Sequence, residues 1–159
     1  KWTADFTYLW THEGWLFVAV VIDLYSRRVV GWSSSARMTA DLVMDALMTA
    51  IWRRGTPRSL MHHSDRGSQY TSERFQDRLT EHGIECSMSR SGNCWDNAVA
   101  ESFFSTMKVE RTDHKMYSTR DHAKADVFDY IERFYNARRR HSTLGYVSPI
   151  DFEQMAAVA

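Results

Sequence analysis

An unbroken run of apolar residues from Trp15 to Ile22 constrains the fold of this chain more than any other feature. The run is rich in β-branched residues and ends at Asp23. It is too short to cross a bilayer, so we expect no transmembrane helix and no membrane partner. A short run of this composition is typical of a strand that is buried on both faces of its sheet. The rest of the chain must therefore supply layers that cover both faces.

The length of 159 residues suits a single domain with its own hydrophobic core. The composition, 43% hydrophobic and 25% charged, excludes a disordered or collagen-like chain. Two cysteines are too few for a disulfide scaffold, and a reducing, cytoplasmic compartment fits this usage. The chain opens inside a strand-like pattern, so we expect it to be a trimmed part of a longer protein.

Charge alone leaves nucleic-acid binding open. The 20 Lys and Arg side chains balance 20 Asp and Glu side chains, whereas nucleic-acid-binding proteins usually carry a basic surplus. Most of the cations are Arg, which suits bidentate contacts to phosphate. A GC-rich genome would also favour Arg, and composition does not separate these two explanations.

The spacing of apolar residues predicts three strands followed by alternating helices and strands. Strands are expected over 2–8, 15–23 and 28–34, and their short connections make them antiparallel. Two more strands, over 60–63 and 84–88, are reached through helices and should run parallel to their neighbours. The expected helices begin near residues that suit a helix start: Thr39, Thr71, Asn97, Thr119 and Pro149. The predicted class is α/β, with a mixed five-stranded sheet and helices on both faces.

Three acidic residues stand where this fold could bring them together. Asp5 lies within the first expected strand, Asp65 follows the fourth, and Glu101 lies one turn into the helix expected from Asn97. If the fourth strand pairs with the first, Asp5 and Asp65 meet near the centre of the sheet, where open α/β sheets bind ligands. Converging carboxylates need a cation, and oxygen ligands select Mg²⁺ or Mn²⁺. Two such ions about 3.5–4 Å apart can stabilise both the attacking and the leaving oxygen of a phosphoryl displacement.

Each acid taken alone also has an ordinary structural explanation. The sequence Asp65-Arg66-Gly67 is good turn chemistry. A Glu near the start of a helix is favoured by the helix dipole. Asp23 is a rival to Asp5, but its place at the end of a strand predicts a hairpin cap or a pair with Arg27 or Arg28.

Four motifs, in order along the chain, resemble the DDE transposases that have a retroviral-integrase core. The first is Trp2-x-x-Asp5-x-Thr7-Tyr8, and the second and third are segments 63–70 and 97–104, which hold Asp65 and Glu101. Thirty-five residues separate Asp65 from Glu101, which is the spacing typical of that family. The fourth motif, residues 134–149, resembles the C-terminal signature of bacterial insertion-sequence transposases of the "insertion sequence three" group.

The resemblance implies an RNase H-like fold and one integrase-type catalytic core over residues 1–159. It implies that Asp5, Asp65 and Glu101 are the catalytic, metal-binding residues, which we call the acidic triad, with two Mg²⁺ or Mn²⁺ ions when DNA is bound. The implied reaction is DNA cleavage followed by strand transfer, without a covalent enzyme intermediate. The implied partners are duplex DNA and further copies of the chain, in a bacterial cytoplasm. The family's N-terminal DNA-binding segment has no counterpart here, so we expect end recognition to depend on another part.

Five further residues are candidates for contact with DNA: Arg66, Asn97, Lys108, Arg139 and His141. Lys108 lies two helical turns after Glu101, where the family places a basic residue beside the phosphate; a solvated surface Lys is the alternative. Asn97 is also the expected cap of its helix. Arg139 and His141 belong to a basic run that suits phosphates and equally suits a helix C-terminus. The polar loop expected over 89–96 should be mobile.

Three functions remain open from the sequence. The leading one is a transposase core. The second is a metal-dependent nuclease, which would use the same triad without strand transfer. The third is an inactive DNA-binding remnant of a transposase, against which the intact acids argue.

Overall fold

The protein is described by a computed structural model that covers residues 1–88 and 95–158. Five strands form one mixed sheet in the order β3-β2-β1-β4-β5. β1 (Trp2–Thr11), β2 (Gly14–Asp23) and β3 (Val29–Ser35) run antiparallel, whereas β4 (Met61–Ser64) and β5 (Glu85–Met88) are parallel additions. The predicted mixed five-stranded sheet is thus confirmed.

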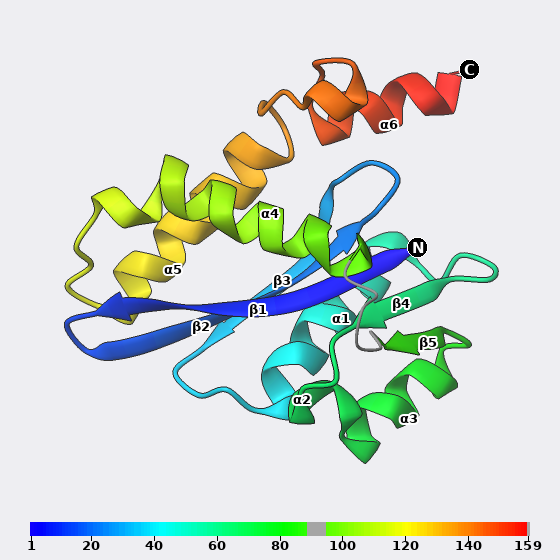
Figure 1. Cartoon of the computed structure of the whole chain (residues 1–159), viewed down its shortest axis with the longest axis horizontal. Helices are drawn as coiled ribbons and strands as arrows, with labels where there is room; N and C mark the ends of the chain where they lie inside the picture. Colours follow the sequence, from blue (N-terminus) through cyan, green and yellow to red (C-terminus); the bar gives the residue numbers. More distant parts are fainter. Residues whose placement is uncertain (89–94, 159) are drawn as a thin grey trace.

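Helices cover both faces of the sheet (Figure 1). α1 (Ala40–Arg54) and α3 (Glu73–Glu81) pack on one face, and α4 (Trp95–Glu110) and α5 (Arg120–Phe128) pack on the other. The shorter elements are α2 (Ser68–Thr71), η1 (Thr112–His114), η3 (Ser142–Leu144) and the terminal α6 (Pro149–Val158). None of the helices in the described ranges is long and apolar enough to cross a membrane.

The central strand β2 is buried as the apolar run predicts. Val18, Val20 and Ile22 pack against α4 and α5, whereas Ala19 and Val21 pack against α1. Full burial of an aliphatic side chain stabilises a fold by about 1.5–3 kcal/mol, so this strand anchors both cores. Trp15, at the hairpin tip, departs from the prediction and is 45% exposed.

The short pairing between β1 and β4 fixes the position of two acids. Trp2 lies opposite His62, and Thr3 lies opposite His63. The same register, continued by two residues, brings Asp65 beside Asp5. Since strand side chains alternate and Trp2 packs on the α1 face, Asp5 faces α4.

The structure corrects two expected helix starts. The helix expected from Thr71 is split into α2 and α3, and Ser72 caps α3 by accepting a hydrogen bond from the Phe75 N–H at 3.3 Å. α4 begins at Trp95, so Asn97 lies in its first turn and does not cap it. The mobile loop expected over 89–96 was wrong for its last two residues, which are helical, and residues 89–94 lie outside the described ranges.

The helix expected after Thr119 is only partly an α-helix. After α5 the chain continues as a π-helix, η2 (Asp129–Tyr135). The Asn136 N–H donates to the Ile131 carbonyl at 3.0 Å, which is a bond to the fifth residue back. Such wide turns are rare in proteins. They change which side chains face the core, and Phe128, expected in the buried stripe, is 46% exposed.

Candidate active site

Asp5 is a half-buried carboxylate in the middle of β1. Its Oδ1 atom accepts a hydrogen bond from the Phe6 N–H at 2.8 Å. Burial raises the pKa of Asp5 from 3.8 to about 6, and the carboxylates of Asp65 and Glu101 raise it further, while the hydrogen bond from Phe6 opposes them. A site that raises the pKa of an acid in this way favours a neutral or metal-bound carboxyl group.

Asp65 directly follows β4 and is fixed by a tight turn. Its Oδ1 atom accepts the Gly67 N–H at 2.7 Å. A Cβ atom at position 67 would lie only 2.9 Å from that same oxygen, so glycine is required for this turn. The turn chemistry predicted for Asp65-Arg66-Gly67 is therefore present, and it holds the carboxylate in place beside β1.

Glu101 reaches the site from α4. That helix is held on the sheet by one apolar face, which comprises Ala100, Phe103, Phe104 and Met107. Glu101 lies on an exposed part of the helix, and its charge still affects the pKa of Asp5. The structure therefore brings the three acids of the triad into one electrostatic cluster.

The cluster carries negative charge that the protein leaves without a counter-ion. Within residues 1–88 and 95–158, no salt bridge involves Asp5, Asp65 or Glu101. Over the same ranges, no three His, Cys, Asp or Glu side chains stand close enough to form a finished metal site. The donor set, which consists only of carboxylate oxygens, suits a hard ion such as Mg²⁺. A cation would remove the repulsion that raises the pKa of Asp5.

Three of the five candidate DNA contacts lie on the segments that carry the triad. Arg66 is exposed and directly follows Asp65. Asn97 lies one turn before Glu101, and its Oδ1 atom is buried without a hydrogen-bond partner. Lys108 lies two turns after Glu101, with its Nζ atom 5.7 Å from the centre of the Tyr8 ring.

The other two candidates, Arg139 and His141, are engaged in local packing. The Arg139 Nε atom donates to Glu110 Oε1 at 2.7 Å. The His141 ring lies edge-on to Tyr135, with centroids 5.0 Å apart, and burial lowers the His141 pKa to about 4, helped by Arg139 and Arg27. The imidazole is therefore neutral at pH 7 and lacks the charge that the basic run suggests. Both residues line a groove of about 650 Å³ beside α4.

Asp23, the rival of Asp5, takes the structural role that its position predicts. Its Oδ1 atom accepts the Tyr25 N–H at 2.8 Å and closes the hairpin. Its charged partner is Arg54, at 3.3 Å, whereas a pair with Arg27 or Arg28 was expected.

Sequence reasoning did not single out Tyr70, which lies beside the triad. Its hydroxyl is buried without a hydrogen-bond partner. Burial raises the pKa of Tyr70 well above its ordinary value, and the charges of Asp5 and Asp65 add to the effect. The one sequence signal was its place at the end of the motif over 63–70.

Comparisons with known proteins agree with this geometry. A family model described as "Integrase core domain" matches residues 1–94, and a second model with the same description matches residues 82–149. "Transposase InsF for insertion sequence IS3A" of Escherichia coli K12 is 53% identical over 153 residues, which cover 96% of this chain and 53% of the relative. The transposase of insertion sequence element IS904 from Lactococcus lactis is 47% identical, with 96% and 60% covered. The chain thus spans about half the length of these relatives.

Solved structures share the fold at low sequence identity. The integrase catalytic core domain of HTLV-2 in complex with magnesium (trimeric form) has a TM-score of 0.71 at 17% identity, with 95% of this chain and 93% of that chain covered. The BIV integrase core has a TM-score of 0.69 at 19% identity, with 98% and 94% covered. These likenesses confirm the RNase H-like fold that the motifs implied. The chain belongs to the integrase core domain family, together with transposases of the insertion sequence three group.

Proposed function

We propose that residues 1–159 form the catalytic core of a transposase that cleaves DNA at the ends of a mobile element and joins the freed ends to target DNA. This core works as one domain within a longer protein, whose other parts recognise the element ends. Its place of action is the DNA of a bacterial cytoplasm. The named activity of the relatives, transposase, supports the proposal.

The observation that carries the proposal is the register between β1 and β4. It sets Asp65 beside Asp5, and α4 adds Glu101 on the same face. Three unneutralised carboxylates are a poor arrangement for stability and a suitable one for two Mg²⁺ ions. The HTLV-2 core was solved in complex with magnesium, which points to the same ion. Bound there, the ions would lower the pKa of a water and neutralise the leaving oxygen.

The reaction balances without a further cofactor. In cleavage, the oxygen of a water bonds to phosphorus, the bond from phosphorus to the 3′ oxygen breaks, and that oxygen leaves with a proton as a 3′-hydroxyl. In strand transfer, this 3′-hydroxyl bonds to the phosphorus of a target phosphodiester and loses its proton, and one bond from that phosphorus breaks. One phosphodiester is made for each one lost, so no energy source is consumed.

Residues beside the triad have a positioning role in this proposal. Lys108 holds a phosphate oxygen of the DNA two turns along α4 from Glu101, and Arg66 contacts the strand beside Asp65. Asn97 offers its buried side chain to the same backbone. Arg139 and His141 face DNA through the groove beside α4, where neighbouring Arg140 supplies an exposed cation.

Copies of the chain assemble on DNA, because two element ends must be joined to one target. Among the solved structures that share the fold, one is an intasome of simian T-cell lymphotropic virus, with a TM-score of 0.75. The HTLV-2 core described above is a trimeric form. Both support an oligomer on DNA for this protein.

A branched DNA substrate that mimics an inserted end tests the function. The parent protein is compared with Asp65→Asn and Glu101→Gln in the presence of Mn²⁺, and exposed Asp77→Asn on α3 is the matched control. We expect joined product from the parent and from Asp77→Asn, and none from the two triad variants. Cut but unjoined product would favour a nuclease. Folded protein that gives no product with or without the remainder of the longer protein would indicate an inactive remnant.

A further inference from the structure

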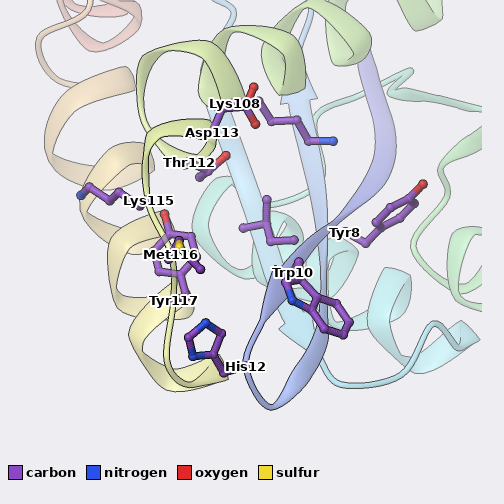
Figure 2. A pocket seen from close by; sticks show the side chains of 10 residues that line it. Tyr8, Trp10, His12, Lys108, Thr112, Asp113, Lys115, Met116 and Tyr117 are labelled. Carbon is purple, nitrogen blue, oxygen red and sulfur yellow. The ribbon is translucent and has the colours of Figure 1, made fainter.

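A pocket of about 270 Å³ lies on the strand and the helix that carry the triad. Figure 2 shows Tyr8 and Trp10 on β1, and Lys108 and Thr112 near the end of α4. Tyr8 is three residues after Asp5, and Lys108 is seven residues after Glu101. At the usual rise per residue, each step is about 10 Å. The pocket therefore lies one equal step beyond the acids along both elements.

Lys108 supplies this pocket with an available cation. Its Nζ atom lies over the Tyr8 ring, and no acid pairs with it among the residues that the structure describes. Lys115, the other lysine of the pocket, is held by Asp126 at 3.0 Å. The pocket thus has one cation with no acid partner, and a phosphate group would pair with it.

Thr112 supplies a buried hydroxyl group. Its side chain is 6% exposed, and its Oγ1 atom has no hydrogen-bond partner. Buried polar groups are normally hydrogen-bonded, so an unpartnered one that lines a pocket points to a polar ligand.

Tyr8 and Trp10 supply exposed aromatic rings. They are 53% and 58% exposed, and each meets Trp15 edge-on, with centroids 4.9 and 4.8 Å apart. Cross-strand aromatic pairs stabilise hairpins, which explains the contacts with Trp15. It does not explain why an available cation and an unpartnered hydroxyl lie beside the rings. Nucleobases stack on such rings without sequence preference.

We infer that this pocket binds one unstacked nucleotide of the DNA strand that the triad cleaves. The inference rests on the proposed function and names its substrate more closely as DNA with a locally unpaired end. The base lies against Tyr8 and Trp10, the phosphate pairs with Lys108, and the Thr112 hydroxyl bonds to the nucleotide. Bases in a duplex are about 3.4 Å apart, so the bound nucleotide lies within about three positions of the cleaved bond.

The pocket can be tested by placing 2-aminopurine singly at each of these positions in DNA. The fluorescence of this base rises when it leaves its stacked neighbours. Binding is measured without divalent cations, so no cleavage occurs. We expect one position to respond. Thr112→Val and Tyr8→Leu should reduce that response and weaken binding of a substrate with a pre-unpaired end by about 3–10-fold, the loss of one good contact. The control is Trp52→Leu, since Trp52 is 89% exposed on α1.

The outcomes separate the pocket from the proposed function. The inference is overturned if bound DNA gives no response at any position, if the variants respond like the parent, or if DNA does not bind. A higher sedimentation mass that Tyr8→Leu abolishes, without any change in DNA binding, would make the surface a protein contact instead. Unchanged thermal unfolding of the variants excludes a folding defect. If cleavage fails on the branched substrate while 2-aminopurine responds, the fault lies with the proposed function. The converse result places it with the pocket.

Discussion

The acids of the triad and the acids near the C-terminal signature differ in how their charge is compensated. Glu153 accepts hydrogen bonds from Arg54 at 2.6 Å, Ser26 at 2.6 Å and Arg28 at 2.9 Å. These bonds overcome burial and lower its pKa. Asp5 has one backbone hydrogen bond and two acidic neighbours, and its pKa rises to about 6.

The difference shows which acids hold the fold together and which await a ligand. Asp126 belongs to the first group, because Tyr117, Arg111 and Lys115 all donate to it and lower its pKa. A compensated acid stabilises the protein by itself, whereas an uncompensated cluster costs stability until a cation binds. Strongly perturbed groups of the second kind are typical of functional sites.

The largest effect that the comparison predicts concerns activity. Asp5→Asn should reduce DNA cleavage by about a thousandfold or more, because an amide cannot replace a carboxylate that holds a metal ion. The same change should leave thermal stability unchanged or higher, since it removes one of three repelling charges. Cleavage assays and thermal unfolding on the same preparation check both parts. A variant that unfolds earlier than the parent would place Asp5 in the structural group.

The next effect concerns Asn136, in the C-terminal signature. Its side chain accepts the Val29 N–H at 2.9 Å and donates to the Val29 carbonyl at 3.0 Å, both buried. Asn136→Leu leaves these groups unpaired and should lower the free energy of unfolding by about 2–4 kcal/mol. Urea unfolding measures the loss. Cleavage per folded molecule should persist, and its disappearance would mean that the signature also contributes to the chemistry.

A smaller loss is expected at Glu153. Glu153→Gln weakens its charged hydrogen bonds and should lower the free energy of unfolding by about 1–3 kcal/mol. Glu81→Gln is the matched control, because Glu81 forms only a surface pair with Arg78 at 3.3 Å. That control should change stability by less than about 0.5 kcal/mol. Equal effects at the two positions would contradict the distinction between buried and surface pairs.

The smallest effect is a difference in pH dependence without metal. The pKa of Asp5 is higher in the folded state than in the unfolded state, so Asp5 favours folding when protonated and disfavours it when ionised. Its contribution is therefore lost as the pH rises from about 4 to about 6. Asp5→Asn should be more stable than the parent at pH 7, by on the order of 1 kcal/mol, and equal to it below pH 4. Parallel curves for the two proteins would refute this.

The parts of the fold that the sequence predicts are those that rest on local pattern. The run from Trp15 to Ile22 predicts the two-sided strand, and the crossovers predict the parallel pairing that sets Asp65 beside Asp5. The family resemblance adds Glu101. Residue spacing alone does not rank these acids above Asp23, because ranking requires the partners of each charge.

The parts that escape prediction rest on contacts between distant segments. The pair between Arg54 and Glu153 joins residues 99 positions apart, and neither residue carries a local signal. The Thr112 hydroxyl lies in a short 3₁₀ turn whose position depends on how α4 ends. The helix break at Ser72 replaced an expected continuous helix because Ser72 is itself a good cap.

The π-helix makes the position of the C-terminal signature sensitive to chain length. One residue of an α-helix turns the chain by about 100° and advances it by about 1.5 Å. Deletion of a single residue within η2 would let the segment relax to α-helical pairing, and everything after it would rotate by that angle. Asn136 would then turn away from Val29, and α6 would carry Glu153 away from Arg54. Homologous chains that differ by one residue here would thus need compensating changes on β3 and α1, although no residue type in the signature had changed.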